Sequence, residues 1–156
     1  PGFKVRHALQ FLNKTATRRL DAHPASSPTT TSSSSSSQSS SPPPVFVDLG
    51  SGDGQAVYEA ARLGYRAIGI EFNWTLWAFS SLRRQLFWSQ EEKRRSEFLR
   101  QDFHSYNLQE ADTIMIFAIP RTMPVLGKKI QTECWPGTDV LAYRFAIPLD
   151  VANVDD

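Results

Sequence analysis

A glycine-rich loop between an apolar strand and a helix restricts the possible folds of this chain more than any other feature. The stretch VFVDLGSGDGQ, residues 45–55, runs from apolar residues into Asp48 and then places Gly50, Gly52 and Gly54 at every second position. Glycine allows a backbone to adopt positive φ and to approach a ligand closely. After the first strand of an α/β sheet, such a loop lies at the carboxyl ends of the strands, where these sheets bind ligands.

The segments after this loop alternate between helical and strand-like patterns. Predicted helices cover 55–65, 74–88 and 123–135, and the charged stretch 89–95 is expected to continue the second helix. Predicted strands cover 45–49, 66–71, part of 97–103, 112–119 and 139–147. Strands that alternate with helices favour right-handed βαβ units. We therefore expect an α/β fold: an open, mostly parallel sheet with helices on both faces.

The residues before the first strand have a different character. Residues 1–22 contain a basic segment, 3–20, with apolar residues on one helical face, which predicts a helix. The family resemblance described below implies that this helix packs on the domain. A mitochondrial transit peptide is the alternative interpretation, because the segment is basic and poor in acidic residues. The Ser/Pro-rich residues 23–44 are predicted to be disordered, and the same resemblance implies that they are an insertion. Residues 45–156 form the main domain, and a chain that begins at Pro1 is consistent with a missing upstream segment.

Composition excludes several classes of protein. With 156 residues, one domain is expected, and a net charge of +1 gives no general argument for a nucleic-acid partner. The single cysteine, Cys134, cannot form an internal disulfide. No apolar run approaches the roughly 18 residues that a transmembrane helix needs. We expect no metal site.

The spacing of the glycines and the charges beside them indicate which ligand the loop would bind. A dinucleotide fingerprint reads G-x-G-x-x-G and holds a pyrophosphate at a helix N-terminus. This loop reads G-x-G-x-G, and Gln55 stands at the third fingerprint position. Carboxylates at Asp48 and Asp53 would repel a pyrophosphate. They suit S-adenosylmethionine, which carries an ammonium and a sulfonium group and no phosphate.

Further candidate contacts to this cofactor lie at the ends of the predicted strands. Glu71 ends the second strand, about 20 residues after the loop, where an acidic residue accepts hydrogen bonds from ribose hydroxyls. Asp102 could accept a hydrogen bond from the adenine amino group, with Phe103 as a packing surface, although a helix cap or a solvated turn explains Asp102 equally well. Ser51 and Asn73 complete the candidate set, but for Asn73 we favour a cap of the following helix.

Three stretches of the sequence together resemble those of a known protein family. VDLGSGDG, AARLGYRAIGIEFN and ADTIMIFAIPRTMPVLGKKIQTECWPGTDVLAYRF are similar to the small class I methyltransferases. That family includes the mitochondrial protein-lysine methyltransferases of the ADP/ATP carrier and of the ATP synthase c subunit, together with bacterial relatives. The resemblance covers about residues 45–147. It implies a Rossmann-like sheet, S-adenosylmethionine as donor and a lysine ε-amine as acceptor, and it carries Asp48, Gly50, Gly52, Glu71 and Asp102 over as cofactor contacts.

The resemblance has two departures. Relatives usually carry an arginine, or another residue suited to their own substrate, just after the glycine loop, where this chain has Gln55. The chain also stops soon after the fifth predicted strand, so the antiparallel sixth and seventh strands of the class are expected to be absent or incomplete. The fifth strand would then be an exposed edge.

The acceptor side is less defined by the sequence. The family places the methyl acceptor after the fourth strand, so Ala118, Ile119 and Pro120 are channel candidates, with Trp74 as a wall unless it lies in the core. No catalytic base is evident, and His104 is more typical of a surface residue. A small-molecule methyltransferase and a non-catalytic cofactor-binding or interaction module remain alternatives. The resemblance implies a protein partner with a target lysine, such as a mitochondrial inner-membrane protein, and hence a mitochondrial location; otherwise a cytoplasmic one is expected.

Overall fold

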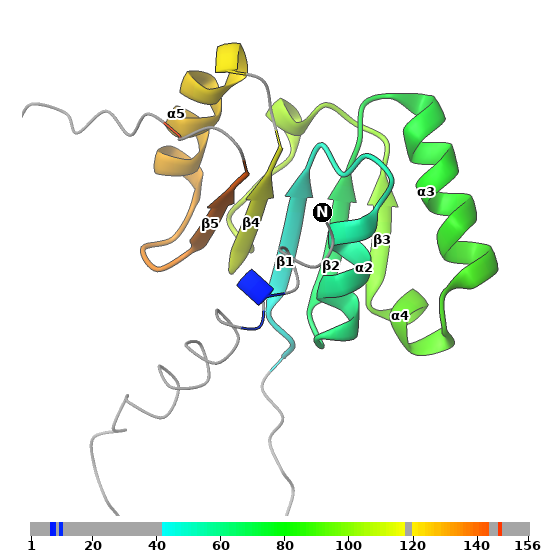
Figure 1. The fold of residues 1–156 in the computed structure, drawn as a ribbon. Helices are drawn as coiled ribbons and strands as arrows, with labels where there is room; N and C mark the ends of the chain where they lie inside the picture. The colour runs from blue at the N-terminus through cyan, green and yellow to red at the C-terminus, as the bar shows by residue number, and fades with distance from the viewer. Residues whose placement is uncertain (1–6, 9, 11–41, 118–119, 144–146, 148–156) are drawn as a thin grey trace, which may run out of the picture.

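The computed structural model describes residues 7–8, 10, 42–117, 120–143 and 147 (Figure 1). The strands are β1 (Val45–Leu49), β2 (Arg66–Ile70), β3 (Ser96–Leu99), β4 (Thr113–Ile116) and β5 (Asp139–Ala142). The α-helices are α2 (Gln55–Arg62), α3 (Trp74–Phe87), α4 (Gln90–Arg94) and α5 (Met123–Glu133), and the 3-10 turns are η1 (Phe103–Ser105) and η2 (Pro120–Thr122). The segments predicted as a packed helix and a disordered tract lie mostly outside the described residues, although His7, Ala8 and Gln10 are helical.

The five strands of the described residues form one parallel sheet in the order β3-β2-β1-β4-β5. The expected α/β class is therefore confirmed. The strand order reverses between β1 and β4. Strands β2 and β3 are added on one side of β1, and the chain then crosses to add β4 and β5 on the other side (Figure 1). In open α/β sheets, ligands bind outside the carboxyl ends of the strands at such a switch point.

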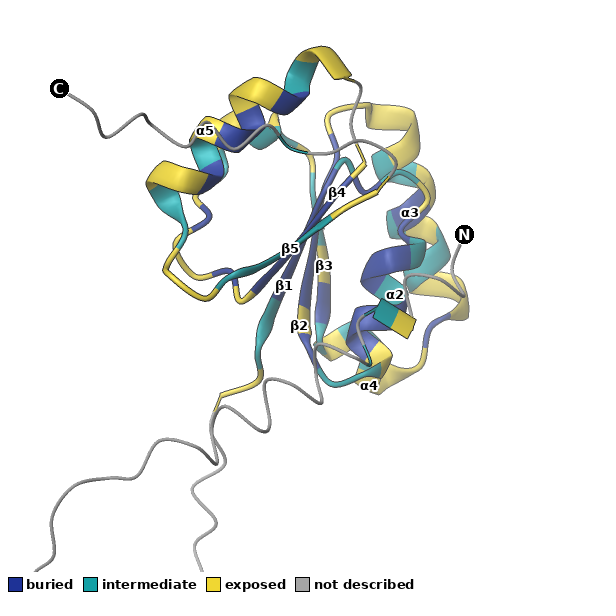
Figure 2. Ribbon diagram, turned by 60° about the vertical axis from the view of Figure 1, so that its left-hand side comes forward, coloured by how far each residue is buried: buried dark blue, intermediate teal, exposed yellow. Residues whose placement is uncertain are grey.

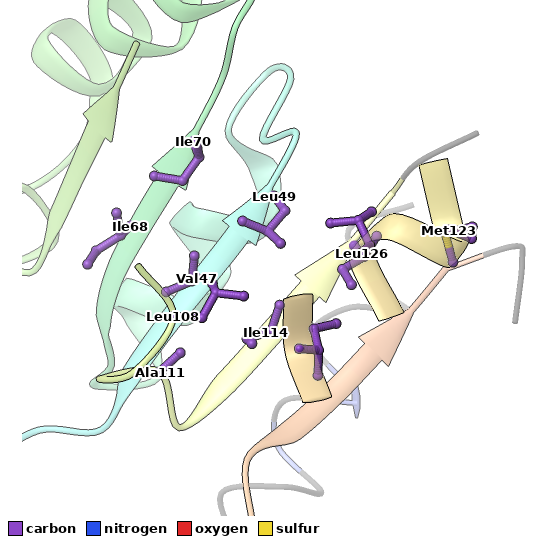
Figure 3. Close-up of a cluster of buried hydrophobic side chains, with 11 residues drawn as sticks. Val47, Leu49, Ile68, Ile70, Leu108, Ala111, Ile114, Met123 and Leu126 are labelled. Atoms are coloured by element: carbon purple, nitrogen blue, oxygen red, sulfur yellow. The ribbon is translucent and has the colours of Figure 1, made fainter. Parts of the chain in front are cut away.

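Both faces of the sheet are covered, as the apolar strands require. Phe46 on β1 contacts a cluster that includes Val57 and Ala60 of α2. The next residue, Val47, points to the opposite face and lies in the cluster that contains Leu126 of α5 (Figure 3). Figure 2 shows α5 on one side of the sheet and α2, α3 and α4 on the other.

The prediction of one helix continuing from residue 74 through the charged stretch 89–95 is wrong. Helix α3 ends at Phe87, and Trp88 takes an extended conformation with φ −89° and ψ 148°. Its ring is buried against Tyr58 and Phe98, which turns the chain back toward the sheet. Ser89 then caps α4 in a capping box. Its Oγ accepts a hydrogen bond from the Glu92 amide, and Oε2 of Glu92 accepts one from the Ser89 amide.

Gly69, in the middle of β2, leaves room for a side chain from the neighbouring strand. A Cβ atom built at this position would lie 2.6 Å from Cδ1 of Phe98 and 2.9 Å from Cβ of Ser51. Gly69→Ala is therefore expected to lower the free energy of unfolding by about 1–3 kcal/mol through overpacking. Urea unfolding measures the change, and Ala142→Val on the exposed end of β5 is the control. Equal stability of Gly69→Ala and wild type would contradict the close packing over this glycine.

Candidate functional site

The loop between β1 and α2 is held open by three glycines in left-handed conformations. Gly50, Gly52 and Gly54 have φ angles of 87°, 53° and 78°, which side chains other than glycine rarely adopt. The backbone amides of Gly50 and Ser51 both donate to the carbonyl oxygen of Ile70, at 2.9 and 3.0 Å. The loop is thus attached to the carboxyl end of β2, beside the point where the strand order reverses.

Glu71 makes a second connection between β2 and the loop. Its Oε2 accepts a hydrogen bond from the Gly52 amide at 2.9 Å, and its Oε1 accepts one from the Asn73 amide at 2.8 Å. The residue is only 8% exposed. A carboxylate oxygen has two lone pairs, so each of these oxygens can still accept one more hydrogen bond from a ligand hydroxyl.

Asp48 is a buried carboxyl group, and no cation of the described residues compensates its charge. It is 4% exposed, and burial raises its pKa from 3.8 to about 7, with further contributions from the negative charges of Glu71 and Asp53. Both charged groups that act on it are carboxylates, so a ligand that brings positive charge would relieve the repulsion and favour the ionised form.

A cavity of ≈310 Å³ lies at the carboxyl ends of β1 and β4. Its lining combines the glycine loop with apolar and aromatic side chains: Asp48, Gly50, Ser51, Gly52, Asp53, Gln55, Ala56, Met115, Phe117 and Tyr143. Ser51 Oγ is buried and has no hydrogen-bond partner among the described residues. A buried hydroxyl in this state is available to a polar ligand group.

The aromatic side of the cavity comes from two neighbouring strands. Phe117 follows β4 and Tyr143 follows β5, and their ring centroids lie 5.6 Å apart. Both rings are partly exposed, so they border the opening. Neither residue was among the sequence candidates, although both lie within the third stretch that resembles the family, because they meet only through the pairing of β4 with β5.

Arg83 is another residue that the motifs did not indicate. From α3 it donates to the backbone carbonyl of Asp53 at 3.1 Å and to Oε1 of Gln55 at 2.7 Å. Gln55 in turn donates to Glu59. The glutamine at the third fingerprint position is therefore part of a polar network that ties α3 to the glycine loop.

The other predicted residues lie outside the lining of this cavity. Asn73 caps α3, since its Oδ1 accepts from the Thr75 amide at 3.0 Å. Asp102 caps η1 by accepting from the His104 amide at 2.9 Å. Phe103 is half-buried beside the His104 ring, with a centroid distance of 4.2 Å. These interactions leave the cofactor roles of Asn73, Asp102 and Phe103 as predictions.

Two of the three residues predicted to form the acceptor channel after β4 lie outside the described residues. Ala118 and Ile119 are outside the described residues, and Pro120 is exposed at the start of η2. Trp74 is 63% exposed, so the alternative that placed it in the core is wrong. Of the neighbouring aromatic residues, Trp77 is anchored by its Nε1, which donates to the carbonyl of Phe98 at 3.1 Å.

Comparison with models of known protein families shows to which family this chain belongs. The family model described as the ANTKMT methyltransferase domain matches residues 48–152, which include the loop, the cavity and β5. The chain belongs to this methyltransferase family. The resemblance drawn from the sequence motifs is confirmed.

Individual relatives agree with this assignment. The chain is 36% identical over 105 residues to the lysine N-methyltransferase of the ATP synthase c subunit from Xenopus laevis, covering 67% of this chain and 45% of that protein. It is 33% identical over 104 residues to the adenine nucleotide translocase lysine N-methyltransferase of Mus musculus, covering 65% and 44%. The chain thus spans less than half the length of these two relatives.

A solved structure supports the fold. The RNA methyltransferase from Salinibacter ruber, in complex with S-adenosyl-L-homocysteine, superposes with a TM-score of 0.55 and 27% sequence identity. The similarity covers 64% of this chain and 63% of that protein. The Rossmann-like class I methyltransferase architecture is confirmed.

Proposed function

We propose that this chain forms the cofactor-binding part of an S-adenosylmethionine-dependent methyltransferase that modifies a protein lysine ε-amine. The observation that carries the proposal is the cavity at the switch point between β1 and β4. There, Asp48 supplies a buried carboxyl group and Ser51 a buried hydroxyl, in a chain that belongs to a methyltransferase family.

The residues of the site fit this cofactor better than a dinucleotide. Three carboxylates lie in or beside the glycine loop: Asp48 in β1, Asp53 in the loop, and Glu71, which follows β2 and accepts from the Gly52 amide. Such a set repels phosphate and favours a cationic ligand. Asp48 and Ser51 would hold polar groups of the cofactor, and the free lone pairs of Glu71 would accept its ribose hydroxyls. When bound, S-adenosylmethionine supplies an activated methyl group on a sulfonium.

The chain's own residues would position the acceptor and remove its water. A lysine ammonium has no lone pair, so the amine must be neutral before it reacts, and desolvation lowers its pKa from about 10.4. Met115, Phe117 and Tyr143 give the cavity an apolar side that favours the neutral amine. Their contribution is positioning and exclusion of water. Pro120, Ala118 and Ile119 remain proposed parts of the same acceptor path.

The names of the relatives favour a membrane protein as acceptor. They describe enzymes that modify lysines of the ATP synthase c subunit and of the adenine nucleotide translocase. By resemblance, we infer that this protein methylates a lysine of a mitochondrial inner-membrane protein and works in that compartment.

Methyl transfer to detergent-solubilised mitochondrial membranes tests the proposal. With labelled S-adenosylmethionine, we expect label on a lysine of a membrane protein, mapped by mass spectrometry. The initial rate should increase as pH rises from about 7 to about 9, because more of the acceptor amine is neutral. Calorimetry with S-adenosylhomocysteine and NAD is the companion measurement, and tighter binding of the former is expected.

Three outcomes would contradict parts of this proposal. Equal or stronger binding of NAD would refute the assigned cofactor. Label found only on a soluble metabolite would move the assignment to a small-molecule methyltransferase. Tight cofactor binding without transfer to any acceptor would favour a non-catalytic module.

A further inference from the structure

Helix α3 lies at the outside of the domain, next to β3, and contacts the glycine loop with its inner side (Figure 1). Neither this helix nor any other in the described part of the chain is long and apolar enough to cross a membrane. Ser80 of α3 is fully buried. A Cβ atom built at Gly54 would lie 3.2 Å from Cβ of Ser80, so the loop and the helix approach each other closely at this glycine.

Arg83 follows Ser80 by three residues and lies on the same side of the helix. Its Nη1 donates to the backbone carbonyl of Asp53 at 3.1 Å and lies 3.5 Å from Oδ2 of the same residue. Its Nη2 donates to Oε1 of Gln55 at 2.7 Å. Two nitrogens of one planar guanidinium group therefore hold the backbone at Asp53 and the first side chain of α2 at the same time.

The two parts of the glycine loop are held from different elements. The amides of residues 50–52 donate to oxygen atoms at the end of β2 and just after it. The following part contains Asp53 between Gly52 and Gly54, and glycine loses more conformational freedom on folding than any other residue. Arg83 binds this second part. The loop is thus fixed from β2 on one side and from α3 on the other.

Both residues that Arg83 binds line the cavity, whereas Arg83 is not among its lining residues. The side chain of Gln55 is fixed at both of its polar atoms, because its Oε1 accepts from Arg83 and its Nε2 donates to Oε1 of Glu59 at 3.2 Å. Arg83 can therefore affect a ligand in the cavity only through the residues of the loop.

We propose that Arg83 is a positioning residue, which acts through Asp53 and Gln55 to keep the glycine loop in the conformation that binds the cofactor. A loop that already has its binding conformation avoids the cost of becoming ordered on binding. If the loop has this conformation in only a fraction of the molecules, the apparent Kd rises by the inverse of that fraction. The identity of the cofactor rests on the proposed function, but the attachment of the loop to α3 does not.

Calorimetry with S-adenosylhomocysteine and the full chain tests the proposal. Arg83→Met keeps the aliphatic part of the side chain and removes its donors. We expect it to raise the Kd by about tenfold, at the low end for hydrogen bonds from a charged group, because the Arg83 side chain is 29% exposed.

The neighbouring arginine of α3 provides the matched control. Arg84 donates to Oγ of Ser96 and to the carbonyl of Lys93, and so attaches the same helix to β3 and α4 instead of to the loop. Urea unfolding is measured for Arg84→Met and Arg83→Met, and both are expected to be less stable than wild type. The Kd of Arg84→Met should nevertheless stay within about twofold of wild type, because the loop keeps its partner.

Arg83→Lys is the conservative variant and keeps the test valid if Arg83→Met does not fold. Lysine keeps the charge but has one nitrogen, which cannot take the place of both guanidinium nitrogens. Its Kd should lie between those of wild type and Arg83→Met. A Kd of Arg83→Lys above that of folded Arg83→Met would contradict the role of the guanidinium hydrogen bonds.

Amide hydrogen exchange of the unliganded protein measures the loop without any cofactor. Arg83→Met should speed exchange at residues 50–55 relative to β4, and Arg84→Met should not, because only the first substitution releases the loop. An unchanged Kd or unchanged loop exchange in folded Arg83→Met would overturn the proposal. So would an equal increase of the Kd in Arg83→Met and Arg84→Met, because attachment of α3 in general would then explain the effect.

The two measurements also distinguish failure of this proposal from failure of the proposed function. A wild type that does not bind S-adenosylhomocysteine would refute the proposed function and the cofactor role of Arg83 with it. Faster loop exchange in Arg83→Met would still show that Arg83 holds the loop.

Discussion

Asp48→Asn is expected to stabilise the unliganded protein above pH 7 and to leave its stability unchanged near pH 4. The pKa of the Asp48 carboxyl is raised from 3.8 to about 7, first by burial and then by Glu71 and Asp53. Between these two values the folded state binds more protons than the unfolded state. The free energy of unfolding therefore decreases as pH rises through this window.

The size of this effect follows from the shift. One pKa unit corresponds to about 1.4 kcal/mol, so ionising Asp48 costs the folded state about 4 kcal/mol once the pH exceeds 7. Asparagine keeps the shape of the side chain and removes the charge. The variant should therefore gain most of this energy at pH 8 and none at pH 4.

Urea unfolding at several pH values measures the difference. Glu110→Gln is the control, because Glu110 is an exposed carboxylate whose ion pair with Arg66 is long, at 3.8 Å. Its removal should change stability by less than about 0.5 kcal/mol at any pH. Parallel pH profiles of Asp48→Asn and wild type would refute the raised pKa.

The same substitution should weaken the proposed cofactor interaction. If the ionised Asp48 binds a cationic part of S-adenosylmethionine, wild-type affinity should fall by up to about tenfold for each pH unit below 7. Asp48→Asn should bind weakly with little pH dependence over this range. A gain in stability with a loss of affinity is expected where a site holds strain for function.

Glu71→Ala is expected to weaken both the fold and the proposed cofactor site. The substitution leaves the amides of Gly52 and Asn73 without the acceptor that each has in the folded protein. Loss of a partner at a fully buried polar group costs about 1–3 kcal/mol. Both of these hydrogen bonds are part-buried, so each should lie in the lower part of that range and the free energy of unfolding should fall by about 2–4 kcal/mol. Affinity for S-adenosylhomocysteine should fall by about 1–3 kcal/mol as the ribose hydroxyls lose their acceptor.

A matched series separates the two roles of Glu71. Glu71→Gln keeps one acceptor oxygen and should be intermediate in stability, while Glu97→Ala on the exposed side of β3 serves as the control. Chemical unfolding and calorimetry give the two free energies independently. An unchanged dissociation constant in folded Glu71→Ala would exclude Glu71 from the cofactor site, and unchanged stability would show that its amide bonds contribute little.

Much of the fold was predictable because its signals are local in sequence. The apolar strand before Asp48, the three glycines and the following helix are adjacent, and Glu71 lies one βα unit away. Strand and helix periodicities then imply a parallel sheet with its loops at one edge. The ends of helices and strands were less predictable. The sequence pattern predicts that Trp88 is helical, but α3 ends before it because its ring is buried against Tyr58 and Phe98.

By itself, the sequence determined the α/β class, the position of the ligand loop and the acidic residues beside it, because each depends on neighbours along the chain. Only the tertiary structure decided which distant groups meet. The pairing of β4 with β5 brings Phe117 to Tyr143, and packing of α3 against β3 brings Arg83 to Asp53 and Gln55. The raised pKa of Asp48 also belongs to the fold, since burial and the approach of Glu71 arise only when β1 and β2 lie side by side.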